Sequence, residues 1–241
     1  MKAVRAANEF ARRLIADHPS RFGMFAAVPL PHIDAALEEV RYTADQLHAE
    51  GVGLMTNYDG RYLGDRLFDP FFAELQTRKA VVFVHPATCN CTRGIDTGVP
   101  LSSIEFPHET TRTIVSLLSG GVFTRCPDVR FIFSHAGGSF PYLETRVARL
   151  NAPLRESLPA LKRQFFDTAL SAYQQVFSTL TQFVSPSQIL FGSDFPFAGV
   201  DTINTTANEL SNLQLPGGAL AAIGRENALR LFPALGNRLA N

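Results

Sequence analysis

The sequence predicts an α/β fold in which helices cover a parallel sheet. Short apolar runs alternate with stretches in which apolar residues recur every three or four positions, the spacing of amphipathic helices. The apolar runs are continuous instead of alternating with polar residues, which indicates strands buried on both faces. Alternation of such strands with helices is typical of a parallel sheet. Because no repeat or linker-like segment interrupts this pattern, residues 1–241 are predicted to form one domain.

The first half of the chain is predicted to supply three strands and the helices between them. Periodic apolar residues predict a helix in the opening residues, which ends at His18-Pro19. A second helix is predicted after residue 32, with Gly51 placed to stop it, and a third begins at Asp69-Pro70. The strands between these helices are continuous apolar runs, at residues 22–29, 52–56 and 80–86.

The second half repeats the pattern after a long loop at residues 87–107. Further strands are predicted at 129–135, 165–170 and 188–194. The predicted helices of this half are at about 108–119, 139–150, 173–183, 202–213 and 217–231. The total is six strands, whereas a closed parallel barrel normally has eight.

Composition excludes several classes of partner. Lysine plus arginine equal aspartate plus glutamate at 22 each, so nothing in the net charge favours nucleic acid or an anionic membrane. No apolar run approaches the roughly 18 residues that cross a bilayer, and the basic N-terminus lacks the apolar stretch of a secretory signal. We therefore expect a cytoplasmic protein that acts on a small molecule.

The cysteines predict no disulfide framework. Cys89, Cys91 and Cys126 cannot all pair with one another. The Cys89–Cys91 pair lacks a second pair at the spacing of a structural zinc site. Reduced cytosolic thiols are therefore the prediction.

Three predicted strands end in a side chain that can bind a metal or move a proton: His85, His135 and Asp194. The carboxyl ends of parallel strands surround a shared mouth, where ligands and chemistry gather. One such histidine alone is equally consistent with a hydrogen-bonded structural residue, and the aspartate with a helix cap. Three such groups at the same position of three strands favour a functional role over a structural one. Two imidazoles and a carboxylate suit zinc, or manganese where more oxygen ligands join.

The sequences "FVHPATC", "FSHAGGSFPYLETR" and "FGSDFPF" together resemble the metal-dependent amidohydrolase superfamily. The most similar branch contains aminocarboxymuconate-semialdehyde decarboxylase and the decarboxylases of resorcylate- and methylsalicylate-type acids. The segment "IGRENALRLF" also resembles the closing helix of that family, and the resemblance runs from about residue 10 to residue 233. It implies a TIM-barrel-like (β/α)8 architecture, N-terminally truncated here to about six strands.

The resemblance also implies a role for each motif residue. His85 matches a metal-binding histidine, and His135 matches a catalytic or water-orienting histidine near the metal. Asp194 matches a metal ligand that also carries a proton. Arg146 matches an arginine that in some members holds a substrate carboxylate in a neighbouring subunit's site, which implies a homodimer. The implied cofactor is Zn²⁺ or, alternatively, Mn²⁺.

The chain departs from the family pattern at its beginning. The first strand of the family carries a His-x-His or Glu-x-His pair of metal ligands, and no two histidines of this chain are spaced in that way. The sequence matches the family from the helix before its third barrel strand. We expect a fragment, a gene product shortened to an internal methionine, or a short variant that fills the gap by oligomerising. His108 and Phe195 are further candidates for binding substrate.

Three functions remain open at this point. The first is metal-dependent, non-oxidative decarboxylation of an aromatic or unsaturated carboxylic acid, with proton delivery by Asp194 and His135. The second is hydrolysis of a lactone, ester or amide by a metal-activated water, with Asp194 as general base. The third is an inactive, truncated remnant that acts as a binding or scaffold chain, a possibility raised by the missing ligand pair.

Overall fold

The computed structural model describes residues 2–92 and 94–239, and within them a six-stranded sheet. All neighbouring strands of this sheet are parallel, in the order β1-β2-β5-β6-β7-β8. The strands are β1 (Phe25–Ala26), β2 (Gly51–Met55), β5 (Val81–His85), β6 (Arg130–Phe133), β7 (Phe165–Asp167) and β8 (Ile189–Leu190). The predicted parallel sheet of six strands is therefore confirmed.

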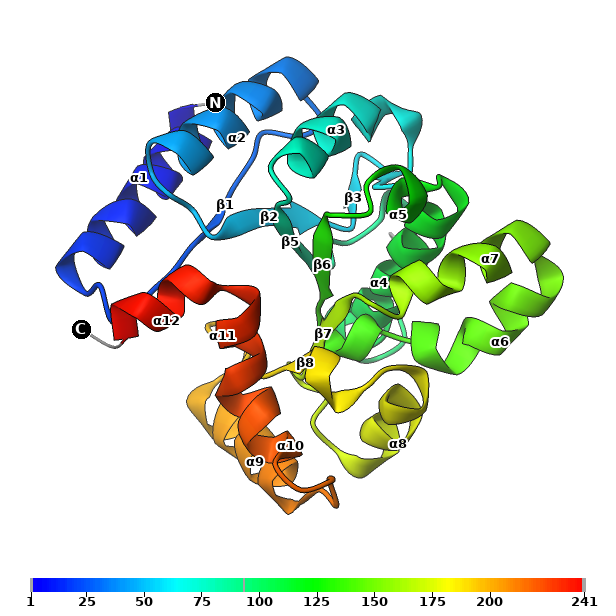
Figure 1. The fold of residues 1–241 in the computed structure, drawn as a ribbon. Helices are drawn as coiled ribbons and strands as arrows, with labels where there is room; N and C mark the ends of the chain where they lie inside the picture. The colour runs from blue at the N-terminus through cyan, green and yellow to red at the C-terminus, as the bar shows by residue number, and fades with distance from the viewer. Residues whose placement is uncertain (1, 93, 240–241) are drawn as a thin grey trace.

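Figure 1 shows the strands following an arc, with most of the helices on its outer side. The helices are α1 (Lys2–Asp17), α2 (Ile33–Asp45), α3 (Asp69–Thr77), α4 (Leu101–Ser119), α5 (Val122–Arg125), α6 (Phe140–Leu150), α7 (Ala152–Leu161), α8 (Gln174–Phe183), α9 (Val200–Asn212), α10 (Ala219–Ala221), α11 (Asn227–Leu231) and α12 (Pro233–Leu239). Among the described residues, none of these helices has the length and apolar character needed to cross a membrane.

The two edge strands are shorter than predicted. The apolar runs at 22–29 and 188–194 each contribute only two residues to the sheet. Each edge strand has a neighbour on one side alone, so its flanking residues have no second strand to hold them extended. The apolar character of these segments predicts that they are buried, but it does not predict how many of their residues pair with the neighbouring strand.

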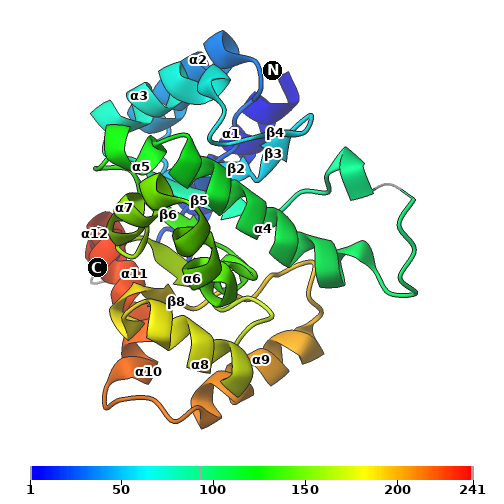
Figure 2. The ribbon, with the colours of Figure 1, turned by 90° about the vertical axis from the view of Figure 1, so that its right-hand side faces the viewer.

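Helix α4 begins at Leu101 instead of at residue 108, so the predicted long loop is wrong in its last third. A proline is favoured in the first turn of a helix and so predicts a start near Pro107, whereas the helix continues through it. Glu105 and Glu109, on either side of that proline, are both buried, so contacts on one face hold the helix together across the missing N–H donor. Before α4, residues 94–100 project away from the body of the molecule (Figure 2).

The concave side of the sheet is covered by the C-terminal segment. Val81, Ile132 and Leu190 form a buried apolar cluster against which Leu231 and Phe232 pack. Figure 1 shows α11 and α12 on the open side of the arc, between the edges β1 and β8. The ring of Phe232 lies 5.7 Å from that of Phe25 in β1, edge to face. The C-terminal segment therefore connects the two edges that no further strand joins in the described chain.

A two-stranded hairpin, β3 (Asn57–Tyr58) and β4 (Arg61–Tyr62), was not predicted and packs against α4. The contact is closest at Gly64, whose N–H donates a 3.1 Å hydrogen bond to Ser116 Oγ. A Cβ atom at Gly64 would lie 1.9 Å from the carbonyl oxygen of Ser116. Glycine is therefore required here, since any side chain would push the hairpin off the helix.

We expect Gly64→Ala to lower the free energy of unfolding by about 1–3 kcal/mol or more, because the added methyl group overlaps helix backbone. Gly217→Ala is the matched control, since a Cβ there meets nothing within 4 Å. Urea denaturation of both variants measures the difference. Equal midpoints for the two variants would contradict the close packing of hairpin on helix.

Candidate active site

The structure brings His85, His135 and Asp194 together at the carboxyl edge of the sheet. His85 is the last residue of β5, His135 lies two residues after β6, and Asp194 follows β8. Oδ1 of Asp194 lies 3.5 Å from Nε2 of His85 and 3.8 Å from Nε2 of His135. One potential ligand atom from each of the three residues lies within 4.8 Å of the other two. Parallel strands thus deliver two imidazoles and a carboxylate to one point.

His85 is oriented by its own backbone neighbour. Its Nδ1 lies 3.0 Å from the carbonyl oxygen of Pro86, which can only accept a hydrogen bond. Nδ1 therefore carries the proton in the neutral ring, and the lone pair of Nε2 faces Asp194. The ring of Phe197 stacks on His85 with centroids 6.1 Å apart, which shields one face of the imidazole from solvent.

His135 lies in a turn whose backbone is left-handed, with φ values of 54° at His135 and 56° at Ala136. Burial and, to a smaller extent, the neighbouring His85 lower the pKa of His135, and Asp194 opposes them, so that the pKa falls to about 4. The ring is therefore neutral at pH 7 in the metal-free chain and has a lone pair to offer. Its Nδ1 is buried and has no hydrogen-bond partner in the described chain.

Asp194 also has a left-handed backbone, with φ of 58°, where the chain turns sharply out of β8. Its carbonyl oxygen accepts a 2.8 Å hydrogen bond from the N–H of Ala198, which closes the turn. The alternative of a helix-capping aspartate does not describe it, because α9 begins only at Val200 and its cap is Gly199. The carboxylate is instead directed at the two histidines.

Asp167, at the end of β7, is a site residue that the sequence analysis missed. Its Oδ1 accepts hydrogen bonds from the N–H of His135 at 2.8 Å and from that of Ala169 at 3.0 Å. The side chain is buried, and burial raises the pKa of Asp167 to about 7 against the opposing effect of these two hydrogen bonds. Asp167 thus holds the backbone of the turn that presents His135.

The remaining predicted residues lie around this centre without joining it. Arg146 is exposed on α6. His108 is exposed on α4, with Nδ1 3.4 Å from the hydroxyl of Ser139. Phe195 is 69% exposed directly after Asp194. Their assignment to substrate binding stays a prediction.

The three central donors suit a divalent cation. Two imidazoles and one carboxylate are a ligand set of catalytic zinc sites, and further oxygen ligands favour manganese. His85 has its Nδ1 engaged by the backbone and its Nε2 directed toward Asp194, which is the arrangement of metal-bound histidines. The unpartnered Nδ1 of buried His135 adds a polar atom that protein groups leave unsatisfied.

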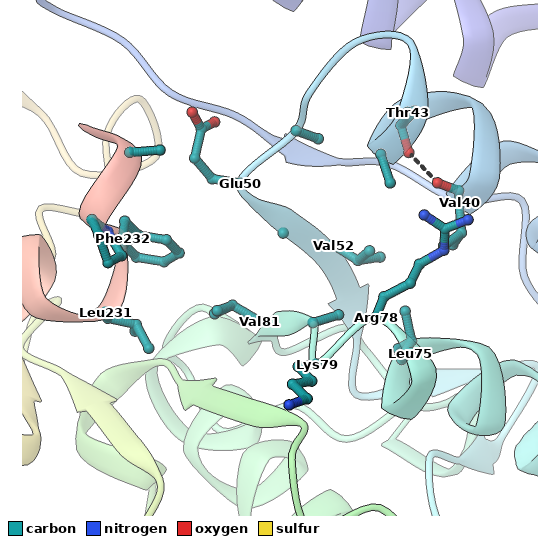
Figure 3. A pocket seen from close by; sticks show the side chains of 16 residues that line it. Val40, Thr43, Glu50, Val52, Leu75, Arg78, Lys79, Val81, Leu231 and Phe232 are labelled. Carbon is teal, nitrogen blue, oxygen red and sulfur yellow. Dashed lines mark hydrogen bonds between the residues drawn. The ribbon is translucent and has the colours of Figure 1, made fainter. Parts of the chain in front are cut away.

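A cavity of about 290 Å³ lies elsewhere, at the amino ends of β2 and β5. Figure 3 shows Leu231 and Phe232 on one side of it and Val40 and Arg78 on the other. In a parallel sheet the amino ends of the strands are opposite the edge that carries His85. This cavity therefore belongs to the C-terminal cover and not to the candidate active site.

A family model described as Amidohydrolase matches residues 1–234 of the chain. The chain belongs to the amidohydrolase family. Its similarity to 6-methylsalicylic acid decarboxylase acuB of Aspergillus aculeatus is 41% identity, over 98% of this chain and 77% of the relative. This amidohydrolase therefore spans about three quarters of the length of that curated relative.

Solved structures place the fold. A crystal structure of 2,6-dihydroxybenzoate decarboxylase in complex with 2,6-dihydroxybenzoate matches with a TM-score of 0.83 and 25% identity, over 95% of this chain and 76% of the other. A dihydroxybenzoic acid decarboxylase from Polaromonas sp., with bound manganese and 2-nitroresorcinol, matches with a TM-score of 0.85 and 21% identity, over 96% and 75%. The resemblance to the decarboxylase branch is confirmed, and so is the TIM-barrel-like fold; this chain spans about three quarters of the length of these relatives.

We expect Asp167→Asn to remove a pH dependence of stability. The folded chain binds the Asp167 proton with a pKa of about 7, against an ordinary value of 3.8. The stability contributed by that proton is complete below about pH 4 and is lost as the pH rises through about 7. Relative to the variant, the metal-free wild-type chain should lose a few kcal/mol of unfolding free energy over that range.

Urea unfolding at a series of pH values measures this difference. Asp17→Asn, at an exposed aspartate, is the control and should leave the pH dependence of the wild type intact. Parallel curves for the wild type and Asp167→Asn would show that the buried carboxyl does not titrate in this way.

Proposed function

We propose that this amidohydrolase is a metal-dependent, non-oxidative decarboxylase of an aromatic carboxylic acid of the 6-methylsalicylate or resorcylate type. The observation that carries the proposal is 41% identity to a 6-methylsalicylic acid decarboxylase along 98% of the chain. The convergence of His85, His135 and Asp194 supports it, because these side chains provide metal ligands and a proton carrier in one place. Its proposed location is the cytoplasm.

The proposed cofactor is a divalent cation, zinc or manganese, held by His85 and Asp194 with His135 beside them. Manganese is bound in the similar Polaromonas decarboxylase, and the imidazole-rich donor set of this chain also suits zinc. Held by His85 and Asp194, such a cation would supply Lewis-acid polarisation of the substrate's carboxylate and adjacent hydroxyl group.

The protein's own part is to move a proton. Decarboxylation of an aromatic acid requires protonation of the ring carbon that bears the carboxylate, after which CO₂ leaves and the ring regains aromaticity. Asp194 is the proposed donor, because its carboxyl lies at the centre of the cluster on a fixed turn. His135, neutral and 3.8 Å from Asp194 Oδ1, is placed to orient that carboxyl or to relay its proton.

We propose that Arg146, His108 and Phe195 bind the substrate. A guanidinium can pair with a carboxylate through two parallel hydrogen bonds. Arg146 is exposed on α6, so it is available to a neighbouring subunit, and we propose that two chains form a homodimer in which each Arg146 serves the other site. The exposed ring of Phe195 offers a flat surface next to Asp194 for an aromatic ring.

The assay for this function is CO₂ release from 6-methylsalicylate and 2,6-dihydroxybenzoate by the purified chain, supplied with zinc or manganese. Asp194→Asn should reduce the rate by about 10²- to 10⁴-fold, since it removes the proton donor and a ligand. His48→Asn is the control, because His48 is exposed and asparagine tolerates its left-handed backbone, with φ of 56°. This control should retain the full rate.

The same preparation separates the other two functions. Ring opening of a lactone without CO₂ release would replace the decarboxylase by a hydrolase. Failure to retain zinc or manganese, together with no turnover of either acid, would favour the inactive remnant.

Mixing two inactive variants tests the proposed exchange of Arg146. In a dimer of Asp194→Asn with Arg146→Ala, one site has both an intact Asp194 and the partner's intact Arg146. Random pairing then restores roughly a quarter of the wild-type activity. No recovery, with dimers confirmed by light scattering, would show that each Arg146 acts within its own chain or not at all.

A further inference from the structure

The segment after β5 brings a second group of metal-binding side chains together, apart from the candidate active site. Cys89 and Cys91 lie on either side of Asn90, and Glu109 comes from the middle of α4. One ligand atom of each lies within 4.8 Å of the other two. Cys89 and Glu109 are buried, whereas Cys91 is exposed, so the group opens to solvent on one side. We propose that these three residues form a binding site for a thiolate-preferring divalent cation of the zinc class.

Glu109 is held rigidly and retains one acceptor position. Its Oε1 accepts from the hydroxyl of Tyr62 at 2.9 Å and from the guanidinium of Arg112 at 2.6 Å. Its Oε2 accepts from the amide of Asn57 at 2.9 Å. A carboxylate has about four lone-pair directions, so three are engaged and one on Oε2 remains for a ligand. A fixed, fully buried carboxylate of this kind loses little conformational freedom when it binds a cation.

The two cysteines are arranged so that one thiolate forms easily. The backbone N–H of Cys91 donates to Cys89 Sγ at 3.2 Å. Donation from the Cys91 thiol and from this N–H lowers the pKa of Cys89, and for the same reason the pKa of Cys91 is raised. The hydrogen bonds therefore favour loss of the Cys89 proton, and a cation that binds both sulfurs takes the place of the thiol protons.

The acidic side chains around Cys89 and Cys91 favour the binding of a cation. Glu105 lies on the same helix, with Oε2 3.6 Å from the Arg112 guanidinium, and this buried oxygen has no hydrogen-bond partner in the described chain. The Arg112 guanidinium is shared between the two carboxylates, Glu105 and Glu109. A divalent ion bound by the two sulfurs as thiolates would offset the negative charge that they add to these carboxylates. Two sulfurs among the ligands select zinc-like cations over magnesium or calcium.

The prediction of plain reduced thiols rested on the absence of a second cysteine pair. The third ligand comes instead from Glu109, a glutamate on a distant helix, which spacing along the chain does not reveal. The cation would tie the segment that leaves His85 to α4. Asn57 already begins that link, since its side-chain amide also donates to the carbonyl of Ala87 at 3.2 Å.

Cadmium is the probe that tests the site. The full chain, reduced with a phosphine and stripped of metal with a chelator, is titrated with Cd²⁺ while thiolate-to-cadmium absorption in the ultraviolet is recorded. The candidate active site contains no sulfur among His85, His135 and Asp194, so cadmium bound there gives no such band. We expect a band that saturates at one cadmium per chain and that zinc abolishes by competition.

Variants locate the band. It should disappear in Cys91→Ser, whose exposed position makes the change harmless to folding, and persist in Cys126→Ser, whose buried thiol contacts the carbonyl oxygen of Phe72 instead. Glu109→Gln, with its fold confirmed by circular dichroism, should keep the band but weaken cadmium binding about 10- to 100-fold. The site is refuted if the wild type gives no band, if Cys91→Ser retains it, or if Glu109→Gln binds cadmium as the wild type does.

Discussion

The candidate active site depends on all six strands running in the same direction with a fixed register. Val84 of β5 pairs with Phe133 of β6, and Asp167 of β7 pairs with Leu190 of β8. The residues that follow each strand therefore emerge at one edge, where the chain turns back toward the helices. Side chains alternate between the two faces of a strand, so a slip of one residue in β5 would direct His85 away from Asp194. The proposed chemistry therefore requires the correct pairing of the strands, because only this pairing brings the site residues together.

The turns that follow β6 and β8 position the side chains of His135 and Asp194 in the site. His135 and Asp194 both have left-handed backbones, which non-glycine residues adopt only when their surroundings enforce it. At His135, Asp167 of β7 holds this backbone by accepting a hydrogen bond from the His135 N–H, and Gly138 permits close packing on the other side. A Cβ at Gly138 would lie 2.0 Å from the carbonyl oxygen of Pro107, so the turn packs directly on α4. The imidazole of His135 is positioned by this turn and by the contact of its Nε2 with Asp194 Oδ1 at 3.8 Å, since its Nδ1 has no hydrogen-bond partner in the described chain.

Sequence periodicity was sufficient to predict the sheet, its parallel direction and the three central residues, because buried strands and their carboxyl ends are marked by local composition. It failed where the decisive partner lies far away in the chain. Asp167 follows two phenylalanines and looks like part of an apolar strand, and its role is set by an N–H group of His135 on the neighbouring strand's turn. Glu109 meets Cys89 only because α4 runs back across the segment after β5. The long helix around Pro107 was missed because its buried face, and not its backbone propensity, maintains it.

The packing of Leu231 and Phe232 into the concave side of the sheet has a consequence for how the protein is made. Synthesis proceeds from the N-terminus, so β1 to β8 leave the ribosome before the residues that cover their inner face. Until Leu231 and Phe232 emerge, the apolar side chains of Val81, Ile132 and Leu190 lack this part of their cover. The inner face of the sheet is therefore covered only after all six strands have been synthesised, which makes burial of this cluster a late event in folding on the ribosome.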